Sequence, residues 1–322
     1  LIFSTAYLPL VGGAEIAIKE ITERLATKYE FVLVTARLRK ELPRVQKVGS
    51  VTVYRVGFGN VFDKVLLPVW GFLKMLPLVR KKPPILFWMV IVSYAGYVAY
   101  FINLFSSKKI PVVLTLQEGD SEAHIEHGKG GLIAFSWRLM LRNAAAVTAI
   151  SSYLAYRARL FGYRGEVAVV PNGVDVTLKK KIRSVAAPLA LEKGSEDIFL
   201  ITTSRLVSKN AIDDVIRALP NLPRTVKFLV LGEGPERERL QALAQMEGVS
   251  ERVQFLGHVL PEDIPRYLAV SDIFVRPSRS EGMGNSFIEA MAAGLPIVGT
   301  QVGGIADFLF DAKRNPDNPT TG

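Results

Sequence analysis

The chain has 322 residues, 49% of them hydrophobic, which allows two domains with separate cores at about 100–200 residues per domain. It has no cysteine and only three histidines, His124, His127 and His258, so a disulfide framework and a thiolate metal site are excluded. A zinc cluster is not expected either, and we predict chemistry that needs no protein-held metal.

The positive charge of the chain lies in its first half. Residues 1–170 carry 22 Lys and Arg against 11 Asp and Glu, a net of +11, and residues 171–322 carry 18 against 19, a net of −1. This charge is either a solvated surface or a face for an anionic partner, such as a phospholipid surface or a phosphorylated acceptor. Nucleic acid would suit the charge too, but no zinc finger or RNA-binding aromatic signature is present, so we expect no nucleic-acid partner.

Strands and helices alternate along the first half of the chain. Residues 14–29 place apolar side chains at 16, 18, 21 and 25, which is the period of an amphipathic helix. Further helices are expected around 131–143 and up to about 161. Strands are expected at residues 1–8, 31–37, 51–57, 85–92, 111–117, 146–152 and 166–175.

One stretch in this half is long enough to be mistaken for a membrane span. Residues 83–107 hold no charged side chain, and about 18 apolar residues suffice to cross a bilayer. We favour a buried strand at 85–91 and a helix at 94–105, because strand formers come first and Ser93 and Gly96 interrupt the stretch.

A second series of strands and helices follows a charged, loop-like junction at residues 171–196. Strands separated by helices imply parallel sheets with right-handed crossovers, whose ligands bind beyond the carboxyl ends of the strands. We therefore predict an α/β fold of two Rossmann-like, doubly wound parallel-sheet domains facing a cleft, residues 1–172 and 173–322. The second series has strands at 197–206, 226–234, 253–259, 272–278 and 295–300 and helices at 211–222, 236–248 and 262–271.

Several motifs occur in a fixed order along nearly the whole chain. They are “PLVGGAE” (9–15), “PNGVD” (171–175), “SRLVSKN” (204–210), “LGEGPERERL” (231–240), “FLGHV” (255–259), “SDIFVRPS” (271–278) and “EGMGNSFIEAMAAGLP” (281–296). This series resembles the family-4 retaining glycosyltransferases of the group 1 type, which use nucleotide sugars and have the two-domain GT-B fold. Relatives continue beyond the polar end “KRNPDNPTTG”, so the resemblance implies a second domain truncated at its C-terminus.

The first motif contains a glycine turn between a strand and a helix. Gly12 and Gly13 permit a tight turn, and the helix start beyond them offers unpaired N–H groups to a phosphate. An ordinary strand-to-helix turn would look the same. The resemblance implies a loop that closes over the donor phosphates.

Two cations follow a strand end in the third motif. Arg205 and Lys209 could neutralise a diphosphate as it departs, or they could form only a solvated basic turn. The resemblance implies the first role. Ser204 and Asn210 stand where glycines are frequent in the family, and Asn210 is a mild change because asparagine tolerates left-handed backbone angles.

The last motif is a glycine-rich bend that runs into a helix. Its backbone N–H groups and helix dipole would favour an anion by about 0.3–1 kcal/mol. The residues expected to contact the donor phosphates there are Gly282, Met283, Gly284, Asn285 and Ser286.

Two glutamates flank this bend. Glu281 is expected to face the sugar and accept hydrogen bonds from its hydroxyls. The resemblance implies that Glu289 binds the ribose of the nucleotide, although Ser286 and Glu289 also match a capping box in which the carboxylate only bonds back to the helix start.

The first domain is expected to hold the acceptor. Gln117 occupies a strand end where many relatives have a histidine, and glutamine can donate to a sugar hydroxyl but cannot carry a proton. We still expect activity, because enzymes of this type are thought to let the leaving phosphate take the acceptor proton. Glu118 and Asp120 are candidates for acceptor contact, and so is His124, which could equally be a plain surface residue.

The resemblance implies metal-independent transfer of a sugar, with retention, from a UDP- or GDP-sugar to an acceptor hydroxyl, in which Glu281, Arg205, Lys209 and Gln117 take part. No other cofactor is expected. A lipid-linked or glycan acceptor of the cell envelope would suit the basic first domain. Residues 62–82 mix apolar and basic groups and fit either a bilayer surface or a helix packed on the sheet. We expect no signal peptide and a cytoplasmic protein, peripheral on the inner face of the membrane if that segment binds lipid.

Two rival functions stay open at this point. A nucleotide-sugar epimerase on the same fold would need acid–base groups where this chain has Gln117. A catalytically silent nucleotide-sugar-binding subunit would tolerate that glutamine.

Overall fold

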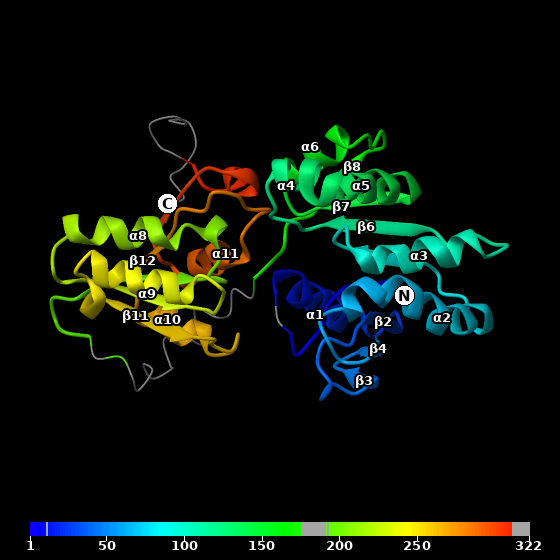
Figure 1. The fold of residues 1–322 in the computed structure, drawn as a ribbon, viewed down its shortest axis with the longest axis horizontal. Coiled ribbons are helices and arrows are strands. Elements are labelled where there is room, and N and C mark those ends of the chain that lie inside the picture. Colours follow the sequence, from blue (N-terminus) through cyan, green and yellow to red (C-terminus); the bar gives the residue numbers. More distant parts are fainter. Residues whose placement is uncertain (11, 175–190, 192, 311–322) are drawn as a thin grey trace. The chain divides into compact units, whose positions relative to one another are not determined.

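The computed structural model describes residues 1–10, 12–174, 191 and 193–310, and these form two compact units, Leu1–Asn172 and Gly173–Gly322 (Figure 1). Most of the predicted junction at 171–196 and the chain end after residue 310 lie outside the described residues. Each unit is a sheet with helices on both faces, so the predicted α/β class with two parallel-sheet domains is confirmed.

The first unit is built on an eight-stranded sheet in the order β3-β4-β2-β1-β5-β6-β7-β8. Strands β2, β4 and β3 lie outward from β1 on one side, and β6, β7 and β8 lie outward from β5 on the other, so the order reverses between β1 and β5. The strands are β1 Ile2–Phe3, β2 Phe31–Ala36, β3 Val45–Val48, β4 Val51–Val56, β5 Phe87–Val90, β6 Val112–Leu116, β7 Ala146–Ala149 and β8 Val167–Val169.

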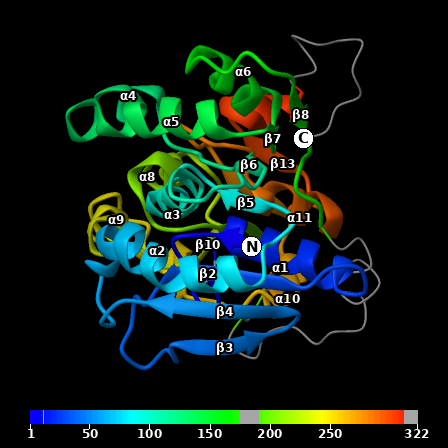
Figure 2. The same ribbon diagram turned by 90° about the vertical axis from the view of Figure 1, so that its right-hand side faces the viewer.

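One strand of this sheet was not predicted. β3 pairs antiparallel with β4 at the edge of the sheet, whereas the other pairs in the described part of this unit are parallel (Figure 2). Three of its four residues are exposed and two, Gln46 and Lys47, are polar, so this edge strand lacks the apolar run that reveals a buried strand.

The helices of the first unit resolve the question about residues 83–107. The segment forms β5 and then a short buried helix, as expected, and no helix in the described part of the chain is long and apolar enough to span a membrane. The helices are α1 Gly13–Leu25, α2 Asp63–Lys81, α3 Tyr94–Leu104, α4 Glu122–His127, α5 Leu132–Asn143 and α6 Ser152–Leu160.

Within residues 62–82 the chain forms helix α2, which packs on α3 and on strands β2 and β4. Its buried face consists of Asp63, Leu67, Gly71, Met75 and Val79. A side chain at Gly71 would lie 2.7 Å from Val98 of α3, so the glycine allows the two helices to approach closely. The opposite face of α2 remains exposed.

The second unit has a five-stranded parallel sheet in the order β11-β10-β9-β12-β13, which reverses between β9 and β12. Its strands are β9 Ile198–Thr203, β10 Val226–Leu231, β11 Val253–Gly257, β12 Ile273–Arg276 and β13 Ile297–Gly299. Its helices are α8 Ile212–Ala218, α9 Arg237–Met246, α10 Ile264–Val270 and α11 Asn285–Ala293.

Apolar clusters cover both faces of this second sheet. One cluster joins α8 and α9 to the sheet, and the other joins α10 and α11 to it. The strands are therefore almost continuously apolar, as in “FLVL” of β10, because both of their faces are buried. This packing leaves the loops at the strand ends as the place for polar groups.

Candidate functional site

The candidate site of the second unit lies where its strand order reverses. The loops after β9 and β12 leave the same edge of the sheet in opposite directions, which is where α/β sheets bind ligands. The loop after β9 carries Arg205 and Lys209, and the loop after β12 carries Glu281. The two loops are joined directly, since the backbone N–H of Arg279 donates to the carbonyl of Lys209 at 2.7 Å.

The loop after β9 is held close to the loop after β10. Ser204 donates its N–H to Leu231, and Leu206 donates to Glu233. A side chain at Gly232 would lie 1.8 Å from the Ser204 carbonyl oxygen, and one at Gly234 would lie 2.2 Å from that of Leu206. The glycines of “LGEG” therefore permit this contact, which fixes the start of the Arg205 loop.

The Arg205 loop turns sharply into helix α8. Lys209 lies in a short 3₁₀ turn, Ser208–Asn210, and the Asn210 side chain donates to the Arg205 carbonyl at 2.7 Å. The left-handed residue is Ala211, with φ 56°, and not Asn210 as the sequence suggested. A left-handed non-glycine residue is strained, and such strain collects at functional sites.

Arg276, at the end of β12, organises this edge and was missed by the sequence analysis. Its guanidinium is 5% exposed and donates to the Glu281 carboxylate at 2.9 Å and to the Ser286 hydroxyl at 2.8 Å. It also lies over the ring of Phe287, 4.5 Å from the ring centre. A charged residue that ends an otherwise apolar strand, “IFVR”, was the available signal.

Helix α11 begins without the capping box that the sequence allowed. Its N-cap is Gly284, with φ 85°, and no side chain caps it. The hydroxyl of Ser286 instead accepts from Arg276. Burial raises the pKa of Glu289, and the positive charge of Arg276 opposes that shift. Glu289 is thus a partly buried carboxylate that does not cap the helix, and its role with ribose stays a prediction.

Unsatisfied polar atoms gather at this edge. Among the described residues, buried side-chain atoms without a hydrogen-bond partner occur at the ends of β9 and β12 and in the loops after them. They belong to Thr202, Thr203, Ser204, Asn210, Arg276 and Ser278. Buried polar groups are normally paired, so such a concentration is typical of a site that binds a polar ligand.

The first unit has a matching edge where β1 and β5 adjoin. Gly12 is the N-cap of α1 and Gly13 its first residue, so the glycine turn lies after β1 as predicted, although residue 11 itself is outside the described part. Ile91, just after β5, has φ 68°. A β-branched residue at that angle is a genuine outlier, and it lies beside the same edge.

Glu118 links the strand ends at this edge. Its carboxylate is 8% exposed and accepts from the backbone N–H groups of Val92, after β5, and Gln117, after β6. Burial raises the pKa of Glu118 to about 7, although these hydrogen bonds and Arg157 oppose the shift. Arg157 is fully buried, and its guanidinium donates to the Tyr153 hydroxyl.

The other acceptor-side candidates are more open to solvent. The side-chain oxygen of Gln117 accepts from Asn172 at 3.3 Å. Asp120 and His124 are exposed, and His124 lies on α4, a helix capped by Ser121 that the sequence analysis did not predict. The structure thus gathers Gln117 and Glu118 at the strand ends and leaves contact between these residues and an acceptor as a prediction.

Comparisons with known proteins agree with this fold. Solved structures that resemble the chain include sucrose-phosphate synthase of Thermosynechococcus elongatus, at TM-score 0.78 and 21% identity over 93% of this chain and 78% of that one. Another is Anabaena HepE in complex with UDP and glucose, at TM-score 0.74 and 21% identity over 97% and 83%. The fold is the GT-B fold of glycosyltransferases.

Sequence models give the family itself. Residues 11–178 match the model “Glycosyltransferase Family 4” and residues 197–316 match “Glycosyl transferases group 1”. The chain belongs to glycosyltransferase family 4. One relative, the GDP-mannose-dependent alpha-(1-6)-phosphatidylinositol monomannoside mannosyltransferase of Mycolicibacterium smegmatis, is 33% identical over 53% of this chain and 48% of its own length. The chain spans about half the length of the curated relatives that it matches first.

Replacement of Arg276 by methionine should lower the free energy of unfolding by about 3–5 kcal/mol, because it leaves the partly buried carboxylate of Glu281 without its counter-ion. Burial already raises the pKa of Glu289, and loss of the Arg276 charge removes the effect that opposes this shift. The folded-state pKa of Glu289 should therefore rise further above its unfolded value, so the stability loss should grow between pH 5 and pH 8. Chemical denaturation at both pH values measures it. Arg266→Met, at an exposed arginine of α10, is the control, and an equal loss at both pH values would contradict the assigned effect of Arg276 on Glu289.

Replacement of Glu118 by glutamine should reduce the fall in the free energy of unfolding between pH 4.5 and pH 7. The folded-state pKa is raised from 4.5 to about 7, so the folded state alone binds the proton in that range and stability falls as the pH rises, by up to about 3 kcal/mol. Above pH 7 the stability lost through ionisation of buried Glu118 no longer changes with pH. Denaturation midpoints across this range compare the variant with Glu122→Gln, at an exposed glutamate of α4. An unchanged slope would show that Glu118 is ionised throughout.

Proposed function

We propose that the chain transfers a sugar, with retained anomeric configuration, from a nucleotide diphosphate donor to an acceptor hydroxyl. The observation that carries this proposal is the edge of the second unit, where Arg205, Lys209 and the start of α11 lie on loops joined by hydrogen bonds. Fixed cations and backbone N–H groups at one such edge suit a diphosphate that gains charge as it leaves.

The proposed step needs no metal and no protein base. The bond between the sugar C1 and the diphosphate oxygen breaks, and its electron pair stays with the diphosphate. The acceptor oxygen forms a new bond to C1 on the same face, and its proton passes to the leaving phosphate oxygen. Arg205 and Lys209 stabilise the growing charge, Glu281 orients the sugar, and Glu289 holds the ribose; Gln117 and Glu118 bind the acceptor in the first unit.

Glu281 can take this role because Arg276 already fixes one of its carboxylate oxygens. The other oxygen, Oε1, faces the N–H of Gly282 at 3.1 Å. These two hydrogen bonds orient the carboxylate before any sugar arrives, so it can accept hydroxyl hydrogen bonds without first losing side-chain freedom. The donor is a UDP- or GDP-sugar, which agrees with the donor named for the mycobacterial relative and with the UDP complex of HepE.

We further propose that the acceptor is a lipid-linked or envelope glycan and that α2 rests on the membrane that carries it. The outer face of α2 carries a row of exposed apolar side chains at helical spacing, Phe62, Val65, Leu66, Val69 and Leu73. Exposed apolar patches of this kind mark partner or membrane surfaces. Arg80 and Lys81 in the last turn of the helix add attraction to anionic phospholipid, worth about 1 kcal/mol per residue near the surface.

Loss of the apolar row should release the protein from membranes. Substitution of Phe62, Val65 and Val69 by serine should weaken binding to vesicles of phosphatidylglycerol and phosphatidylcholine by about tenfold or more, because each buried side chain contributes to the partition. Vesicle flotation measures it. Ile85, Leu132 and Val170, which are also exposed, provide a matched triple serine control, and equal binding by both variants would place the contact elsewhere.

A thermal-shift panel of UDP, GDP, ADP and their sugars tests the donor site. One ligand class should raise the melting temperature of the chain, since saturation at 100 times Kd adds about 2.7 kcal/mol. Glu289→Gln should weaken that ligand by about 10- to 100-fold, because a charged acceptor of two ribose hydrogen bonds is lost. Glu262→Gln, at an exposed glutamate, is the control.

The same preparation separates the rival functions. Transfer to an acceptor with retention supports the proposal, whereas a sugar isomer formed without any acceptor identifies an epimerase. Donor binding with no transfer to any acceptor identifies a silent subunit. A Glu289→Gln variant that loses stability but keeps its nucleotide affinity would remove Glu289 from the site.

A further inference from the structure

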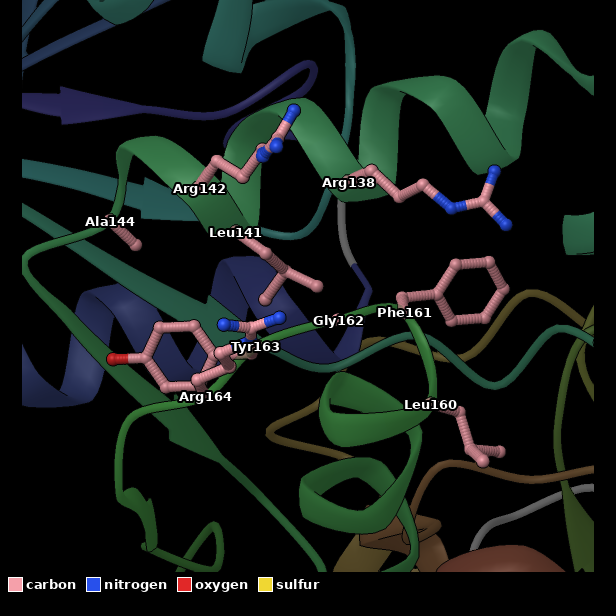
Figure 3. Close-up of a pocket in the computed structure, with 9 residues that line it drawn as sticks. All are labelled: Arg138, Leu141, Arg142, Ala144, Leu160, Phe161, Gly162, Tyr163 and Arg164. Carbon is pink, nitrogen blue, oxygen red and sulfur yellow. The ribbon is translucent and has the colours of Figure 1, made fainter.

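The first unit has a cavity at the edge of its sheet opposite the strand ends that carry Gln117 and Glu118. The cavity has a volume of about 710 Å³ (Figure 3). Its walls are the end of α5 with the turn into β7 and the end of α6 with the turn into β8. Both turns precede their strands, so the cavity belongs to the amino ends of a sheet whose proposed acceptor site is at the carboxyl ends.

The cavity is lined by three arginines and by no acidic residue among the described ones. Arg138 and Arg142 lie one turn apart on α5, and Arg164 comes from the turn after α6 (Figure 3). In the part of the chain that the structure describes, none of the three guanidinium groups forms an ion pair or a hydrogen bond; Arg138 instead lies over the ring of Phe161 at 5.8 Å. The N–H groups of these three guanidinium groups can therefore donate hydrogen bonds to the oxygen atoms of a ligand.

The turn that carries Arg164 is fixed in place. Gly162, with φ 91°, donates to the carbonyl of Arg159, and Tyr163 donates to that of Ala158, both at 3.0 Å, which is the Schellman end of a helix. A side chain at Gly165 would lie 2.8 Å from the Tyr163 ring, so this glycine lets the ring lie across the backbone. Little ordering is then needed when a ligand binds.

Stabilisation of the helix ends accounts for only part of this positive charge. Two helices end at the cavity, and each carboxyl end carries about half a negative charge, which a basic side chain in the last turn stabilises. Arg142 lies in the last turn of α5. The three arginines bring a formal charge of +3 against about −1 from the two helix ends, and the excess makes the guanidinium groups repel one another.

We propose that this cavity binds a phosphate-bearing ligand, as a site separate from the donor and acceptor sites. Guanidinium groups bind phosphate oxygens in pairs of parallel hydrogen bonds, and three of them suit a diphosphate or a phosphate ester. Leu141 and Leu160 add an apolar wall for the rest of the molecule. The ligand is either a soluble phosphate compound or the phosphorylated headgroup of a lipid, and these share the recognised chemistry.

Hydrogen exchange with inorganic pyrophosphate tests the proposal and locates the binding, because the donor site would bind pyrophosphate too. Pyrophosphate should slow exchange in peptides covering residues 138–146 and 160–167. The triple variant Arg138→Gln, Arg142→Gln, Arg164→Gln should weaken this protection by about tenfold or more in pyrophosphate concentration, while protection at 203–211 stays as in the wild type. The matched control replaces Lys28, Lys47 and Lys108, which are exposed lysines of the same unit, by glutamine.

The outcomes separate the alternatives. Protection by soluble pyrophosphate identifies a soluble ligand, and protection only by vesicles that contain phosphatidic acid identifies a lipid headgroup; both support the site. Absence of protection with either probe overturns it. A triple variant that melts well below the wild type without any anion also overturns it, because the arginines would then serve the helix ends; relief of their repulsion predicts equal or higher stability.

Discussion

The buried guanidinium of Arg276 is the constraint on which the arrangement of the second unit depends. A positive charge taken out of water must be paired, and the available partners are Glu281 and Ser286 on the chain that follows β12. Satisfying the guanidinium therefore folds the glycine-rich bend back over the strand end and sets where α11 begins. The charge of Arg276 also opposes the burial that raises the pKa of Glu289, so one cation orients Glu281 and acts electrostatically on Glu289.

The first unit also has a buried ionisable side chain that needs hydrogen-bond partners, but this side chain is acidic. There the buried ion is the carboxylate of Glu118, which takes N–H groups from the ends of β5 and β6. Glu118 thus joins loops that leave neighbouring strands, and Arg276 joins the segment after β12 to the end of β9 by donating to the Thr203 carbonyl at 3.4 Å. In both units a left-handed non-glycine residue, Ile91 or Ala211, lies in an adjoining loop. At each strand-order reversal, a network of polar side chains thus fixes the loops at the strand ends.

Periodicity and motif order were enough to predict the fold class, the strand–helix nature of residues 83–107 and the segments that carry the site. They could not show Arg276, because its role depends on partners brought together by folding, and one arginine at a strand end looks like any other. They left the role of Glu289 open, since Ser286 matched a capping box until Arg276 took its hydroxyl. β3 and α4 escaped notice because they are short and exposed, and the pattern of burial that reveals an element is weak there.

The two units also differ in how they use their cations. In the second unit most arginines outside the candidate site are paired with acids, as Arg217, Arg239 and Arg279 are around Asp213. The first unit carries the excess of +11, and much of it stands without acidic partners at the end of α2 and around the arginine-lined cavity. The second half of the chain is nearly neutral because its 18 basic and 19 acidic residues balance. The first unit instead projects a field over a wide surface, which suits anionic partners much larger than a nucleotide.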